Sequence, residues 1–193
     1  MTTPAMAKVG PNAVLQLTDV LRERISASTM IAAFTAAGIA RYLDRPPQCM
    51  IDETEVAALH HALLRAAPGT GPNLCAEAGT RTADYLLANR IPAFAQVLLR
   101  LLPPGLAARL LVRAIARNAW TFAGSGMFSA SFPGGRKLVL EIAHNPLALP
   151  GCPWHCAVFN RLFTVLVSRH LRMTHRDCCA AGADSCRFEI GWV

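Results

Sequence analysis

The sequence predicts an α+β protein in which a helical N-terminal part packs on a small antiparallel four-stranded sheet. Apolar residues recur at helical spacing through the first two-thirds of the chain. The last third of the chain predicts the order strand, strand, helix, strand, strand, and apolar residues alternate with polar ones in its strand segments. We expect a single domain over residues 1–193, with a helical part over 8–122 and an α/β part over 123–193.

The helical part begins with "PNAVLQLTDVLRERI", whose apolar residues lie close to a 3.6-residue period. Further helices are expected over residues 29–43, 51–67, 71–90, 92–102 and 105–122. Asp52 is the expected N-cap of the helix at 51–67, with Glu53 and Glu55 in its first turn. Negative charge is favourable at that end of a helix.

In the last third of the chain, Pro133-Gly134-Gly135 separates two alternating runs and is typical of a hairpin. A helix is expected over 152–171, followed by strands in "LRMTHRDC" and "CRFEIGWV". Because side chains alternate along a strand, residues two apart should share a face. These sets are Leu138, Leu140 and Ile142 in one strand, and Phe188, Ile190 and Trp192 in another.

The composition is apolar and basic. Hydrophobic residues make up 53% and charged residues 16%, which favours a large core, an apolar cavity or a buried dimer face. The net charge of +7 comes almost entirely from scattered arginines, which suit carboxylates and phosphates, so nucleic-acid binding is not expected. No apolar run is long enough to span a membrane, and no secretory signal is evident. We expect a cytoplasmic protein with reduced cysteines.

The stretch "HRDCCAAGADSCRF" contains three of the seven cysteines in the pattern H-x2-C-x3-G-x3-C-x-F. If strands flank it, the loop brings His175, Cys178 and Cys186 together, and Gly182 supplies the tight turn. Cys152, before the preceding helix, is the best fourth ligand. Four such nitrogen and sulfur ligands describe a closed structural zinc site. Buried core thiols and a redox dithiol are the alternatives.

The pattern C-x3-G-x3-C-x-F resembles the 4-vinyl-reductase domain superfamily, which is related in fold to subunits of transport particles (TRAPP). That resemblance implies a zinc site made of a Cys, an acid, a Cys and a Cys. It maps onto Cys152, His175, Cys178 and Cys186, with His175 where the acid usually stands. The substitutes in this sequence are Cys156, His155 and Cys179.

Other stretches narrow the match. "VGPNAVLQL", "AGTRTADYLLANRIPAFAQVLLRLLP", "AWTFAGSG" and "CPWHCAVFNRLF" look like the bacteriochlorophyll 4-vinyl reductase family, the J protein of bacteriochlorophyll synthesis. The resemblance covers about residues 8 to 193. It implies a role in photosynthesis, acting on or carrying divinyl tetrapyrroles such as protochlorophyllide, with structural Zn2+ in the α/β part. For such a role, the expected location is the cytoplasm or the periphery of the photosynthetic membrane.

The sequence favours a tetrapyrrole carrier over an autonomous reductase. Reducing a vinyl group needs an electron carrier, and no G-x-G-x-x-G follows a strand and opens a helix. No catalytic residue is assigned. The alternatives are a vinyl reductase with an external electron donor, and a small-molecule sensor or assembly module.

A carrier needs cations for the propionates of the ring and aromatic residues to stack on it. Arg109, Arg113 and Arg117, here called the arginine stripe, are spaced four apart along one expected helix. Trp120, Phe122 and Phe128 follow as candidates for stacking, and His60 is a candidate axial ligand. The competing interpretation is ordinary: a solvated arginine face, core aromatic residues and a structural histidine.

Two kinds of partner are expected besides the tetrapyrrole. The first is a second copy of the chain: related folds dimerise through helices, so we expect a homodimer formed mainly by the N-terminal helical part. Enzymes of the bacteriochlorophyll pathway, to which a carrier would present its cargo, are the other.

Overall fold

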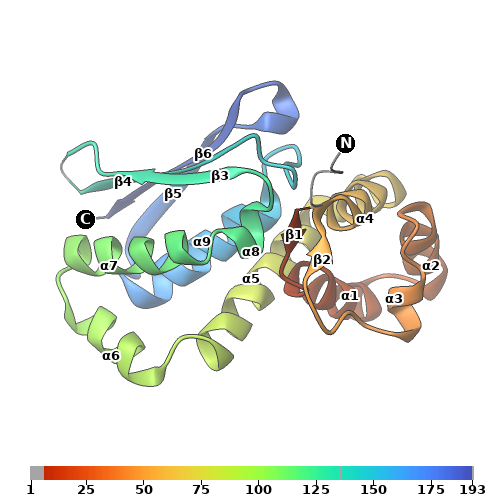
Figure 1. The fold of residues 1–193 in the computed structure, drawn as a ribbon, viewed down its shortest axis with the longest axis horizontal. Coiled ribbons are helices and arrows are strands. Elements are labelled where there is room, and N and C mark those ends of the chain that lie inside the picture. The colour runs from red at the N-terminus through yellow and green to blue at the C-terminus, as the bar shows by residue number, and fades with distance from the viewer. Residues whose placement is uncertain (1–6, 135, 193) are drawn as a thin grey trace, which may run out of the picture.

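A computed structural model describes residues 7–134 and 136–192, and its α+β class is the one that the sequence predicts. Figure 1 shows the helices that follow the N-terminus gathered at one end of the molecule and the larger sheet at the other. In the described residues, no helix combines the length and apolar character needed to cross a bilayer.

The N-terminal end is built from short helices around a two-stranded ribbon. Its elements are β1 (Lys8–Val9), α1 (Asn12–Arg24), α2 (Ala27–Ala36), α3 (Arg41–Asp44), β2 (Ile51–Asp52) and α4 (Glu53–Ala66). The strands β1 and β2 pair in antiparallel fashion, Lys8 opposite Asp52. The predicted N-cap is confirmed, because the carboxylate of Asp52 accepts a hydrogen bond from the Thr54 amide at 2.8 Å.

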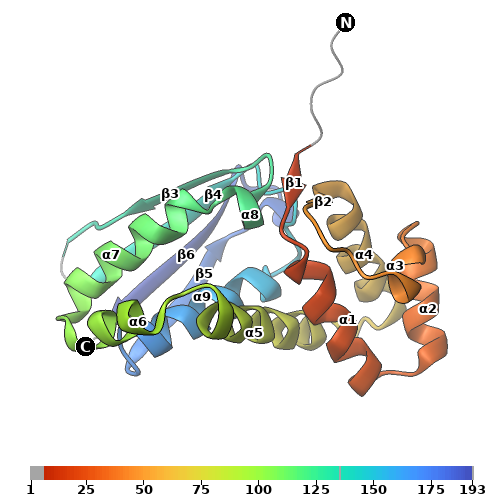
Figure 2. The same ribbon diagram turned by 60° about the horizontal axis from the view of Figure 1, so that its bottom comes forward.

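Four helices connect this end to the sheet. They are α5 (Gly71–Asn89), α6 (Ala93–Leu101), α7 (Pro104–Arg117) and α8 (Trp120–Ala123). Figure 2 shows α5 running from the N-terminal helices toward the sheet, beside α9 (Pro153–Leu166). Gly79 lies at their contact, where a Cβ would overlap the carbonyl of Trp154 and the side chain of Ala157. The absence of a side chain at Gly79 therefore lets the two helices approach.

The larger sheet contains β3 (Met127–Ser131), β4 (Lys137–Ala143), β5 (Leu171–Asp177) and β6 (Ser185–Trp192). Its strands lie in the order β3-β4-β6-β5, and every neighbouring pair among these described strands is antiparallel. The predicted inward sets of β4 and β6 are buried, and both pack in one cluster with α7 and α9. Gly135, part of the predicted hairpin turn, lies outside the described residues.

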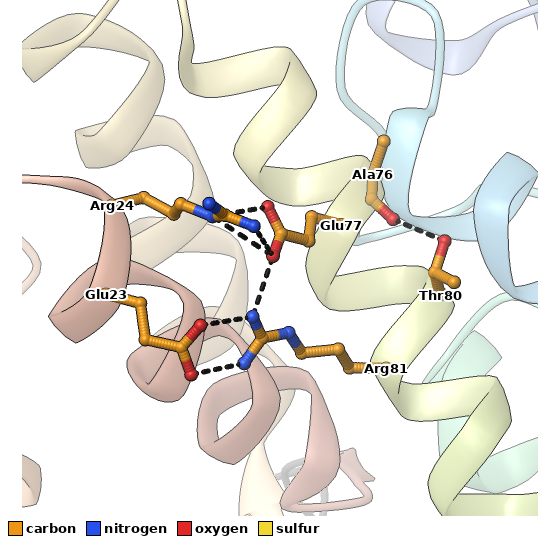
Figure 3. Close-up of polar contacts among 6 residues, drawn as sticks. All are labelled: Glu23, Arg24, Ala76, Glu77, Thr80 and Arg81. Atoms are coloured by element: carbon orange, nitrogen blue, oxygen red, sulfur yellow. Dashed lines mark hydrogen bonds and ion pairs between the residues drawn. The ribbon is translucent and has the colours of Figure 1, made fainter.

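The core has two clusters, one among the N-terminal helices and one under the sheet. Leu87, Ile91 and Phe122 pack against both. On the outside, Figure 3 shows an ion-pair network between α1 and α5: Arg24 pairs with Glu77 at 3.1 Å, and Arg81 pairs with both Glu77 and Glu23. Thr80 in α5 donates to the Ala76 carbonyl of its own helix at 3.1 Å. The guanidinium groups lower the pKa of both glutamates.

Two expected helices are divided in the structure. The one over 29–43 breaks after Ala36, because Gly38 adopts φ +73° and ends α2 before α3 begins. The one over 105–122 ends at Arg117, and α8 is a separate turn that begins at Trp120.

Candidate functional site

The structure brings together the four residues predicted to bind a metal. One ligand atom from each of Cys152, His175, Cys178 and Cys186 lies within 4.8 Å of the other three. The Cys152 sulfur is 3.2 Å from that of Cys186 and 3.6 Å from that of Cys178. Sulfur ligands of a tetrahedral zinc ion stand about 3.8 Å apart, as Zn–S bonds of about 2.3 Å require. The group therefore has the size of a tetrahedral metal site.

The backbone explains how these side chains meet. Cys152 precedes α9 in the left-handed conformation, with φ +43°, a strained geometry for a residue other than glycine. His175 pairs with Phe188 across the sheet, and a register shift follows directly in β5. The chain then turns through a short 3-10 helix, η1 (Cys179–Ala181), and Gly182 at φ +89° before β6 begins. The predicted turn at Gly182 is confirmed.

The surroundings suit a metal cation. Cys152, Cys178 and Cys186 are buried. The Nε2 atom of His175 is also buried and has no hydrogen-bond partner among the described residues. A buried ring nitrogen without a partner, on a histidine whose ring belongs to this group, is costly unless something else binds it. The donor set therefore fits a thiophilic ion such as zinc.

Hydrogen bonds within the group favour one thiolate. Cys152 donates to the sulfur of Cys186, and this bond is the main cause that lowers the pKa of Cys186 to about 5. The Cys179 amide and the Asn145 side chain also donate to that sulfur, each at 3.4 Å. The same bond raises the pKa of Cys152. Such N–H···S contacts are typical of the outer shell of a cysteine-ligated metal.

The three substitute ligands lie outside the group. His155 is buried with its Nε2 atom 3.3 Å from the Phe122 carbonyl, and burial lowers its pKa to about 4. The Cys156 thiol donates to the Gly151 carbonyl at 3.4 Å. Cys179 contributes its amide to Cys186, while its own thiol points to the Ile142 carbonyl at 4.0 Å.

An open depression of about 470 Å³ adjoins the four ligands, between α4, the β4–α9 loop and η1. Its lining residues are His61, Leu64, Arg65, Asn145, Ala148, Pro150, Cys179 and Ala180. His61 and Arg65 are one turn apart on α4, so they project from the same helix face. Asn145 and Cys179 line this depression and also donate hydrogen bonds to Cys186.

The predicted ligand-binding residues do not come together. All members of the arginine stripe are exposed on α7, and none lines the depression beside α4 or the smaller one around Trp192. Trp120 is 57% exposed. Phe122 and Phe128 instead pack edge to face at 5.5 Å. The stripe and the aromatic residues are therefore not part of the depression beside the metal ligands.

His60 has no open side for an axial bond to a macrocycle. It is buried, its Nε2 atom lies 3.2 Å from the Ala13 carbonyl, and burial lowers its pKa to about 4. Its neighbour His61 faces the depression instead. Two adjacent histidines on a helix cannot both face the core, so the sequence shows that one must point outward. Which of the two does so depends on how α4 packs against its neighbours.

Two known proteins resemble this chain over most of its length. The chain is 47% identical over 194 residues to a bacteriochlorophyll synthase 23 kDa chain from Cereibacter sphaeroides, covering 97% of this chain and 92% of the relative. It is 38% identical to a bacteriochlorophyll synthase 23 kDa chain from Rhodobacter capsulatus, covering 95% and 86%. No protein-family model matches the sequence.

Solved structures similar to this one include H-NOX proteins. An unliganded Fe(II) H-NOX protein from K. algicida has a TM-score of 0.65 at 9% identity, covering 96% of this chain and 97% of that chain. Another solved structure is described as concerning heme redox potential and its modulation by protein-induced porphyrin distortion. It has a TM-score of 0.55 at 7% identity, and the match covers 95% of this chain and 100% of that chain. At such identities the likeness shows a shared fold. By its sequence identity to the first two relatives, the chain belongs to the family of bacteriochlorophyll synthase 23 kDa chains, the J-protein family that its motifs resemble.

Proposed function

We propose that this protein binds a divinyl tetrapyrrole of bacteriochlorophyll synthesis, of the protochlorophyllide type, and presents it to pathway enzymes without reducing it. The names of its relatives support involvement in bacteriochlorophyll synthesis. The observation that supports tetrapyrrole binding most directly is the fold. Over 95% of its length, this chain has the same fold as a protein whose description concerns heme and porphyrin distortion.

The depression beside α4 is the proposed contact with the macrocycle. Its volume of about 470 Å³ lies in the usual range of small-molecule sites. His61 offers an imidazole to a central metal, and Arg65 offers a bidentate partner for a propionate. Leu64, Ala148 and Pro150 supply apolar surface. The arginine stripe is not part of this proposal, because its members lie outside the depression.

Zinc has a structural role in this proposal. Cys152, His175, Cys178 and Cys186 would complete its coordination, which leaves no open position for catalysis. By tying β5, β6 and the start of α9 together, the ion would hold Cys179 and Ala180, one wall of the depression, in place. Removal of zinc is therefore expected to weaken tetrapyrrole binding as well as folding.

An absorbance titration with a dicarboxylate divinyl porphyrin tests the site. The wild-type protein should shift the Soret band and bind at micromolar concentration. Arg65→Gln should weaken binding roughly tenfold, and should leave binding of the methyl ester nearly unchanged, because one charge-assisted contact is lost. His61→Ala should weaken binding of the magnesium form more than that of the metal-free form. Arg113→Gln, which removes the same charge from α7, is the matched control.

The second candidate is a vinyl reductase that takes electrons from an external donor, which the resemblance to the 4-vinyl reductase family favours. A sensor or assembly module is the third, and absence of any Soret shift would favour it. Homodimer formation, contacts with pathway enzymes, location in the cytoplasm or at the photosynthetic membrane, and the relation to transport-particle subunits stay predictions.

A further inference from the structure

The net charge of the chain originates in one segment. Of the 19 basic and 12 acidic residues, seven basic ones lie within residues 85–140, and this segment contains no Asp or Glu. The rest of the chain therefore holds twelve residues of each sign. Four of the seven basic residues lie on α6 and α7: Arg100, Arg109, Arg113 and Arg117.

The helix α6 turns an apolar stripe to solvent. Phe94, Val97, Leu98 and Leu101 follow one another at helical spacing and are all more than half exposed, Phe94 and Leu101 by 76% and 78%. A helix that packs only on its own protein turns such a stripe inward. Here only Leu99 of α6 is buried, and two polar side chains make the other contacts. Gln96 donates to the Leu87 and Ile91 carbonyls, and Arg100 donates to the Val165 carbonyl.

The outward face of α7 adds both apolar and positively charged side chains to this surface. Leu106 and Leu110 are exposed, 53% and 41%, on the side of the helix that also bears the arginine stripe. No ion pair involves the stripe among the described residues, and the Arg109 guanidinium lies over the Phe132 ring, 4.4 Å from its centroid. Figures 1 and 2 both show α6 and α7 as consecutive helices along one edge of the molecule.

We propose that the hairpin of α6 and α7 docks on the surface of an anionic lipid bilayer. Exposed Phe and Leu side chains would enter the boundary between headgroups and acyl chains, and the arginines would meet lipid phosphates. The α6 helix has 9 residues and is about 14 Å long, roughly half the thickness of a bilayer core, so it lies on the membrane and does not cross it. The uncompensated positive charge of this segment supports an anionic surface as the partner.

A second copy of the chain fits the same surface less well. A two-fold contact would place this segment against itself, with positive charge on both sides and no acidic residue to offset it. Elsewhere in the chain, half of the acidic residues already form ion pairs with its own arginines. They are Asp19, Glu23, Glu55, Glu77, Asp84 and Glu189.

Co-sedimentation of the full, zinc-loaded chain with vesicles tests the proposal. The protein should bind vesicles of phosphatidylglycerol and phosphatidylcholine in equal parts, and should bind much less to phosphatidylcholine alone or at high salt. The triple variant Phe94→Gln, Leu98→Gln, Leu101→Gln should bind at least about tenfold more weakly, because three exposed side chains no longer gain burial. Neutralising the arginine stripe (Arg109→Gln, Arg113→Gln, Arg117→Gln) should have an effect of similar size.

Control variants distinguish binding through this surface from nonspecific hydrophobic binding and from a general effect of net charge. Ile31→Gln removes an exposed apolar side chain from α2, and Arg45→Gln with Arg169→Gln and Arg172→Gln removes three exposed charges elsewhere. These controls should bind vesicles within about twofold of wild type. Equal losses in the controls, or equal binding to neutral vesicles, would overturn the proposal. So would light scattering that shows a dimer dissociated by the apolar variant while vesicle binding is unchanged, which would identify a second copy as the occupant.

Discussion

At the scale of single residues, the cysteine loop is the part of the candidate site that spacing predicts. His175, Cys178 and Cys186 are close in sequence, so flanking strands suffice to bring them together. Cys152 is distant, and its place followed from its position before a helix that returns to the sheet. His61 and Arg65 could not be assigned in this way, because the loop after β4 that forms the opposite wall has no recognisable motif.

Replacing one predicted ligand tests the zinc site. Cys186→Ser should abolish stoichiometric zinc and lower the free energy of unfolding by at least about 3 kcal/mol, because metal binding and folding are coupled. Elemental analysis and denaturant unfolding measure the two effects. Cys156→Ser is the matched control, since that thiol lies outside the group, and it should keep one zinc per chain. A wild-type protein without stoichiometric metal would rule out the site.

The buried histidine of α4 predicts a dependence of stability on pH. Burial lowers the pKa of His60 from 6.5 to about 4, so the unfolded chain takes up this proton first. Stability from neutral His60 is therefore complete above about pH 6.5 and is lost as the pH falls toward 4, by up to about 3 kcal/mol. His60→Gln should remove this loss. The difference in unfolding free energy between the wild type and this variant should therefore become smaller as the pH falls from 6.5 to about 4. Parallel pH profiles for the two proteins would contradict the assignment.

At the scale of elements, periodicity predicts most helices and the inward sets of β4 and β6. It does not predict β1 and β2, because two-residue strands have no measurable alternation. It also cannot say which way an apolar stripe points. In α6 the stripe faces solvent, whereas the similar pattern in α1 packs into the core. The direction of the stripe depends on the elements that pack against the helix, and the sequence of the helix alone does not reveal them.

The contact of α5 with α9 predicts a strong effect of a small substitution. Gly79→Ala places a Cβ against the Trp154 carbonyl and within 2.9 Å of the Ala157 side chain, so the helices must separate. We expect a loss of about 1–3 kcal/mol in unfolding free energy. Because α9 begins beside Cys152, zinc affinity should fall as well. Gly69→Ala, where an added Cβ meets nothing within 4 Å, is the control. Unchanged thermal unfolding of Gly79→Ala would refute this account of the contact.

At the scale of the whole molecule, two surfaces are separate in the described residues: the depression between α4 and η1, and the apolar, basic face of α6 and α7. Composition predicts both an apolar excess and a basic charge, but not where each lies on the surface. The family resemblance predicts the tetrapyrrole, whereas the likeness to H-NOX proteins shows a shared fold. In the two proposals made above, the depression binds the tetrapyrrole and the face of α6 and α7 binds the membrane surface.

The carrier hypothesis is tested most directly by anaerobic incubation of the zinc-loaded protein with divinyl protochlorophyllide, followed by product analysis. Separate samples receive a nicotinamide donor, reduced ferredoxin or no donor. The account predicts a bound tetrapyrrole, seen as a shifted Soret band, whose vinyl group is recovered intact from every sample. Stoichiometric or catalytic appearance of the ethyl product with either donor would contradict the account and would identify the protein as a vinyl reductase.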